Sequence, residues 1–76
     1  MKAYVLMHIH GGEIAQVVRE LRRLECVEEA HMTFGPYDVV AVLTADDLKH
    51  LGRIVSTGIR PIPGVLDTLT CLATDT

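Results

Sequence analysis

The chain is poor in cysteine and aromatic residues and has no long apolar segment. Its 76 residues include two cysteines, two tyrosines, one phenylalanine and no tryptophan. Cys26 and Cys71 are too few for a disulfide framework or a zinc site, so we interpret them as small apolar residues in a reducing compartment. No apolar run approaches the roughly 18 residues that span a bilayer. The apolar start is interrupted by His8 and His10 and has no credible cleavage site, so we expect a cytoplasmic protein without a membrane partner.

A basic stripe is missing as well. The net charge is −3, and the one cationic cluster, Arg19, Arg22 and Arg23, is diluted by Glu20 and Glu25. Nucleic-acid binding depends on neutralising phosphates and, for single strands, on aromatic stacking platforms. We therefore expect no direct contact with DNA or RNA.

The sequence does contain apolar residues at the periods of short strands and helices. Extended runs are expected at residues 4–9, 27–34, 37–44 and 65–73, and helical stripes at 14–24 and 48–55. Asp46 or Asp47 is the expected N-cap of the second helix, which Gly52 weakens by about 1 kcal/mol relative to alanine. Pro61 and Pro63 exclude a continued helix. The order βαββαβ predicts a single α+β domain over residues 1–76, ferredoxin-like, with a four-stranded antiparallel sheet and both helices on one face.

Two strands are apolar on both faces, although the helices cover only one face of such a sheet. In the first strand Val5 and Met7 alternate with Tyr4 and Leu6, and residues 39–43 are apolar throughout. An uncovered apolar face of several hundred Å² costs on the order of 10 kcal/mol at ~25 cal/mol per Å², as much as a small domain's whole stability. We therefore expect a homodimer in which two sheets pack face to face.

Two motifs stand out: Thr33-Phe34-Gly35-Pro36-Tyr37-Asp38 before the third strand, and residues 62–70, IPGVLDTLT, at the start of the last. Together they resemble the effector-binding domain of Lrp/AsnC-family transcription regulators, the RAM domain, from Ala3 to about Ala73. Full-length members carry a helix-turn-helix before this domain, whereas here the first strand begins at once. The resemblance implies a stand-alone amino-acid sensor. It also implies that dimers assemble into octameric or decameric rings, and suggests full-length Lrp/AsnC-type regulators as further partners.

The candidate ligand-binding residues are Gly35, Tyr37, Asp38, Thr68 and Thr70. A free amino acid is a zwitterion: its carboxylate needs N–H or O–H donors, and its ammonium needs a carboxylate or carbonyls. Asp38 is the expected ammonium partner, Gly35 allows close approach to the backbone, and the two threonines offer hydroxyls. In the proteins that this domain resembles, the effector lies between neighbouring dimers, near this turn. The abundance of Val, Leu and Ile suggests an apolar or branched-chain amino acid. We expect no cofactor and no metal.

Several alternatives remain open. Gly35-Pro36 is first a turn, Asp38 is of a type that often binds the amides of its own turn, and Thr68 and Thr70 are good strand formers. A structural oligomerisation module without a ligand fits the same sequence. So does a domain of the ACT type, which also binds amino acids. A small dimeric enzyme would need His8 and His10 as an acid–base or metal pair, but a third ligand is hard to find and no catalytic triad stands out.

Overall fold

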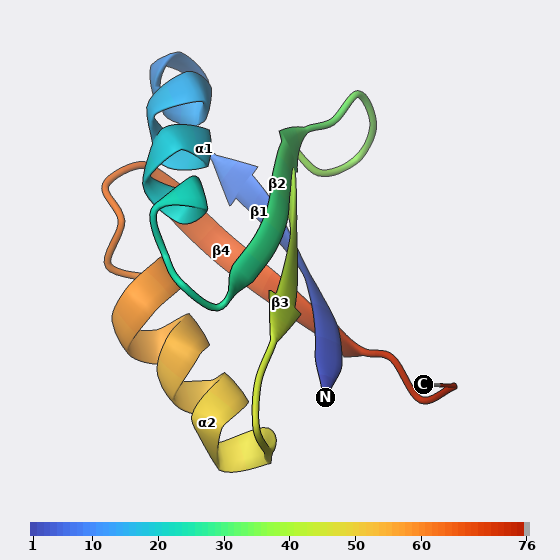
Figure 1. Ribbon diagram of the computed structural model, residues 1–76. Helices are drawn as coiled ribbons and strands as arrows, with labels where there is room; N and C mark the ends of the chain where they lie inside the picture. The colour runs from blue at the N-terminus through green and yellow to red at the C-terminus, as the bar shows by residue number, and fades with distance from the viewer. Residues whose placement is uncertain (76) are drawn as a thin grey trace.

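Four strands form one antiparallel sheet in the order β2-β3-β1-β4. The computed structural model describes residues 1–75. Figure 1 shows both helices on one side of the sheet, so the expected ferredoxin-like βαββαβ architecture is confirmed. The strands are β1 (Lys2–Ile9), β2 (Val27–Met32), β3 (Val39–Thr44) and β4 (Val65–Leu72), and the helical segments are η1 (Gly11–Glu13), α1 (Ile14–Arg22), α2 (Leu48–Arg53) and η2 (Ile54–Ile59).

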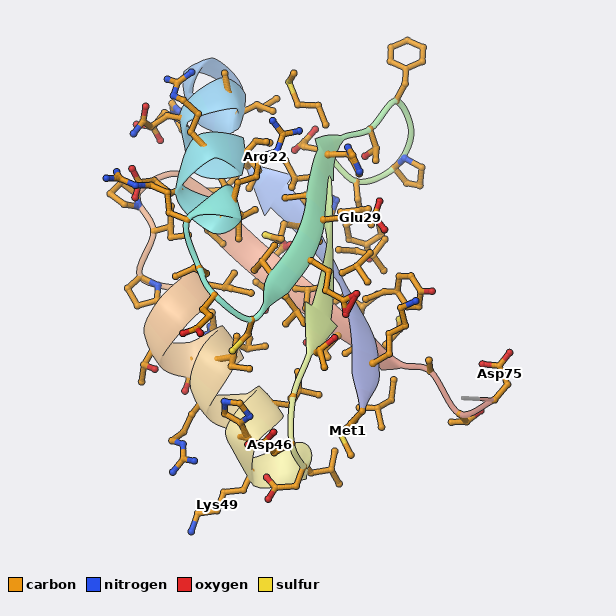
Figure 2. The ribbon with its side chains drawn as sticks, in the orientation of Figure 1. Met1, Arg22, Glu29, Asp46, Lys49 and Asp75 are labelled. Atoms are coloured by element: carbon orange, nitrogen blue, oxygen red, sulfur yellow. The ribbon has the colours of Figure 1, made fainter. Side chains whose placement is uncertain are left out.

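The core lies between the sheet and the two helices. In β1 every second side chain, from Ala3 to Ile9, faces the helices and is at most 5% exposed. The facing stripe of α1 buries Val17, Val18 and Leu21, as the helical spacing predicts. At the end of the same helix the Arg22 guanidinium donates two hydrogen bonds to the Ala30 carbonyl (3.1 and 2.9 Å), which joins α1 to β2 (Figure 2).

The second helical segment begins and ends for identifiable reasons. The Asp47 carboxylate accepts a hydrogen bond from the His50 amide (2.7 Å), so Asp47 is the N-cap. The helix runs past residue 55 as the π-helical segment η2, at whose end the Arg60 N–H donates to the Val55 carbonyl at 2.9 Å. Within residues 1–75 no helix has the length and apolar character that a membrane crossing requires.

Gly64 explains the second motif in physical terms. Its φ of 102° lies in the left-handed region that side chains disfavour. A Cβ at this position would also stand 2.9 Å from the Cβ of Glu13, so a side chain here would require the backbone to shift. The Gly64 carbonyl accepts a hydrogen bond from His10 N–H (2.8 Å). The turn therefore brings the start of β4 to the end of β1.

The face of the sheet away from the helices has an apolar centre and polar margins. No helix covers this face in Figure 1. Paired residues of antiparallel strands share a face, so the register places Leu6 between Val40 and Leu69, and Tyr4 between Val42 and Cys71. We call these six residues the open face. The polar residues around them are Lys2, His8, Glu29, His31, Thr44 and Asp67.

Candidate functional site

The segment between β2 and β3, residues 33–38, forms a closed loop that projects beyond the sheet (Figure 1). Two hydrogen bonds close its neck: Thr33 N–H donates to the Asp38 carbonyl (2.9 Å), and Thr33 Oγ1 donates to the Tyr37 carbonyl (2.6 Å). We call this segment the β2–β3 loop. Because of this closure β3 starts at Val39, two residues later than the sequence suggested.

Asp38 is anchored to β1 through its backbone and its side chain. Its N–H donates to the Met7 carbonyl (2.9 Å), and its Oδ2 accepts the Ile9 N–H (2.8 Å). The carboxylate thus serves the backbone where the ladder shifts register between His8 and Ile9. Among the described residues, only Oδ2 of the Asp38 carboxylate accepts a hydrogen bond, and Oδ1 accepts none. The side chain is half-buried.

The loop tip offers backbone donors and unfilled space. The N–H groups of Phe34, Gly35 and Tyr37 make no hydrogen bond within residues 1–75. A Cβ added to Gly35 would meet no atom within 4 Å, and Gly35 has no positive φ, so the chain's own packing does not require glycine here. Phe34 is fully exposed. The space beside Gly35 is therefore free of side chains of the same chain.

His8 and Asp67 join the loop to the sheet. His8 Nδ1 lies 2.7 Å from Oδ1 of Asp67, and Nε2 lies 2.9 Å from the Pro36 carbonyl oxygen. The imidazole stacks on the Tyr37 ring, with the centroids 4.5 Å apart and the planes 23° from parallel. The bond to Asp67 and then the bond to the Pro36 carbonyl raise the pKa of His8 above its ordinary value, against a smaller opposing effect of desolvation.

The two threonines lie away from this cluster. Thr68 pairs with Met7 and Thr70 with Val5, so both are on the helix-facing side of β4. Asp38 directly precedes β3, and β1 lies between β3 and β4 in the sheet. Thr70 instead lines an open groove of about 340 Å³ between β4 and the helical segments α2 and η2. The other residues that line it are Leu48, Leu51, Gly52, Val55, Ser56, Arg60 and Leu72.

The structure thus brings Gly35, Tyr37 and Asp38 together and keeps Thr68 and Thr70 apart from them. It adds His8 and Asp67, which the sequence analysis did not assign to the ligand site; His8 was considered there only in a pair with His10. The sequence does show His8 as a polar residue in an otherwise apolar strand. Its hydrogen-bond partner, Asp67, is 59 residues away, so the sequence does not reveal the pair. His10 lies beyond the end of β1 and is exposed. Across the described residues, no three His, Cys, Asp or Glu side chains are grouped as metal ligands.

Comparison with known proteins identifies related sequences and folds. The family model described as "Lrp/AsnC ligand binding domain" matches residues 2–76. The HTH-type transcriptional regulator FL11 of Pyrococcus abyssi is 30% identical over 76 residues, which are all of this chain and 50% of the relative. The chain spans about half the length of the curated relatives it matches, or somewhat less.

Solved structures have the same fold. The protein TTHA0845 of Thermus thermophilus superposes with a TM-score of 0.93 at 32% identity, covering 99% of this chain and 94% of the other. A transcriptional regulator from Neisseria meningitidis, NMB0573, crystallised as an L-Met complex, has a TM-score of 0.86 at 14% identity. That match covers 97% of this chain and 50% of the regulator and is a likeness of fold alone.

Proposed function

Because the chain belongs to the Lrp/AsnC ligand-binding domain family, we propose that it binds a free amino acid as a regulatory effector at the β2–β3 loop. The observation that carries this proposal is that one short loop holds both kinds of partner: a carboxylate oxygen of Asp38 and the N–H groups of Phe34, Gly35 and Tyr37, none of which is hydrogen-bonded within residues 1–75. A zwitterion needs these two kinds of partner a few ångströms apart.

In the proposed complex the effector ammonium binds Oδ1 of Asp38, and its carboxylate binds the N–H groups around Gly35. The open space at Gly35 admits the ligand backbone. Thr68 and Thr70 remain in the proposal only as residues that a neighbouring subunit places near the loop, since within one chain they face the helices. The effector is proposed to be an apolar amino acid. The Neisseria regulator, which has the same fold, binds L-Met.

The proposed assembly begins with a homodimer through the open face. Tyr4 is 40% and Leu69 is 47% exposed in the isolated chain, and the centre of this face is apolar with a polar margin, as in stable interfaces. Dimers then meet at the β2–β3 loops in octameric or decameric rings. An effector lodged between dimers would couple its binding to assembly. Full-length Lrp/AsnC-type regulators are the proposed protein partners.

A thermal-shift screen of the purified protein against the twenty amino acids tests the function. A ligand present at 100 times its Kd stabilises the folded state by about 2.7 kcal/mol, which raises the Tm of a domain of this size by roughly 10–20 °C. We expect a shift with one or a few apolar amino acids and none with glutamate or lysine. Absence of a shift with all twenty would leave a structural oligomerisation module as the function.

Phe34 tests the contact between dimers. Its side chain is fully exposed in the chain, so Phe34→Ser should leave the fold and its stability unchanged. If dimers meet at this loop, each contact loses roughly 1.5–3 kcal/mol of apolar burial. We expect sedimentation velocity to show that Phe34→Ser forms dimers at concentrations at which the wild type forms rings. The matched control is Met32→Ser, which removes another exposed apolar side chain, on the helix side of β2. Rings of unchanged mass in Phe34→Ser would contradict the assignment.

A further inference from the structure

His8 has a hydrogen-bond environment that only one of its charge states satisfies. Both ring nitrogens face acceptors: Oδ1 of Asp67 at 2.7 Å and the Pro36 carbonyl at 2.9 Å. A neutral imidazole carries one N–H donor and one acceptor nitrogen, so it satisfies one of these partners and opposes the other. The imidazolium donates to both. The geometry therefore selects the protonated ring, which also suits stacking of a cation on the face of Tyr37.

The contact with Pro36 is the only hydrogen bond that holds the tip of the β2–β3 loop to the sheet among the described residues. The bonds of Thr33 close the neck, and those of Asp38 hold the end of the loop to β1. At the tip, the Pro36 carbonyl is bound by His8. Proline fixes its own φ, so fixing this carbonyl orients the peptide groups on both sides, including the Tyr37 N–H.

We propose that His8, held by Asp67, is a positioning residue of the effector site, which fixes the Pro36 carbonyl and the Tyr37 ring in the binding conformation when protonated. This inference rests on the proposed function and names a proton as a second regulator of the same loop. His8 contacts the loop from β1, and Asp67 supports it from β4, so three segments distant in sequence act as one unit.

The direction of the pH effect follows from the groups around the ring. Asp67 on β4 and Asp38 at the end of the loop favour the imidazolium, and the Tyr37 phenol ring lies against it. The pKa of His8 is raised, so its contribution to stability is complete below pH 6.5 and is lost as pH rises through the higher folded-state value. The loop contact, and with it effector affinity, should weaken over the same range.

NMR titration of protein labelled with 13C-histidine and 15N tests the linkage without any effector. We expect the Gly35 amide shift to follow the His8 ring with one midpoint, above 6.5. Asp67→Asn should lower that midpoint, and His8→Gln should abolish the pH dependence of Gly35. His31→Gln is the matched control, because His31 also borders the open face but bonds Glu29 rather than the loop (3.1 Å). If the Gly35 amide chemical shift does not change as His8 loses its proton, the inference is wrong.

Calorimetry with the amino acid that gives the largest thermal shift separates this inference from the function itself. We expect His8→Gln to bind about tenfold more weakly than wild type at pH 6, the scale of one charge-assisted hydrogen bond, with the difference vanishing at high pH. Equal affinities at pH 6 overturn the positioning role while leaving the effector site intact. If the wild type binds no amino acid, the proposed function fails, and the NMR titration still decides whether His8 controls the loop.

Discussion

Asp38→Asn should weaken effector binding by about ten- to a hundredfold while leaving the folded protein nearly as stable as wild type. An asparagine Oδ1 still accepts the Ile9 N–H, so the backbone of β1 keeps its partner. What disappears is the negative charge opposite the effector ammonium. A hydrogen bond to a charged group contributes roughly 1.5–3 kcal/mol, which sets the expected range. Isothermal titration calorimetry measures the affinity, and urea denaturation measures the stability.

Asp38→Ala is the informative companion to this variant. It removes the charge and also leaves the part-buried Ile9 N–H without an acceptor, at a cost of about 1–3 kcal/mol in the free energy of unfolding. If both variants bind the effector like wild type, the carboxylate serves only the backbone of β1. Asp38 would then have a structural role, directed to β1 rather than to its own turn, and the ligand, if any, would bind elsewhere.

Leu69→Glu should dissociate the proposed homodimer, raising its Kd by about a thousandfold. Leu69 pairs with Leu6 at the centre of the open face. In a face-to-face dimer with two-fold symmetry the substitution buries two carboxylates without partners, which costs several kcal/mol. Because the side chain is 47% exposed in the isolated chain, the change should disturb the fold itself little. Light scattering over a dilution series measures the mass, and circular dichroism measures the fold.

The matched control for this experiment is Leu48→Glu. Leu48 is 63% exposed on α2, on the covered side of the sheet, and does not belong to the open face. It should leave the dimer intact. A dimer of unchanged Kd in Leu69→Glu would refute packing through the open face. A variant that unfolds on dilution would show that folding and dimerisation are coupled, as small obligate dimers require.

These experiments also separate the candidate functions. A sensor loses its ligand response with Asp38→Asn and keeps its assembly, whereas a structural module responds to Leu69→Glu and not to Asp38→Asn. The curated relatives are named as transcriptional regulators, and the family is described by ligand binding. An enzyme built on His8 finds less support in the geometry, because both ring nitrogens already have partners within the chain.

Local patterns were sufficient to predict the elements and their order. Alternation put Val5 and Met7 on one face of the first strand, and the structure shows that this face is the core. The stripe of Val17, Val18 and Leu21 predicted α1, and an aspartate before Leu48 predicted the N-cap. Each of these features depends on residues within a few positions of one another. Boundaries were less accurate: β3 begins at Val39 because Thr33 closes the preceding loop, a contact that periodicity does not register.

The candidate site shows where sequence reasoning ends. The spacing of Thr68 and Thr70 predicts that both lie on one face of β4, which the structure confirms. That face is turned toward the helices, so neither threonine lies near Asp38. That depends on the pairing of β4 with β1, and a shift by one residue would exchange the faces. The same pairing puts Asp67, rather than either threonine, against His8.

Amphipathic periods, turn residues and caps act over short stretches of chain, so the order of elements, the ferredoxin-like class and the position of the β2–β3 loop follow from the residues alone. The uncovered apolar face follows as well, because two helices cover only one side of a sheet whose strands are apolar on both. The hydrogen bonds of His8 to Asp67 and to Pro36 do not follow from the residues alone. They depend on strand order and register, which arise when residues 8, 36 and 67 are brought together by packing of the whole core.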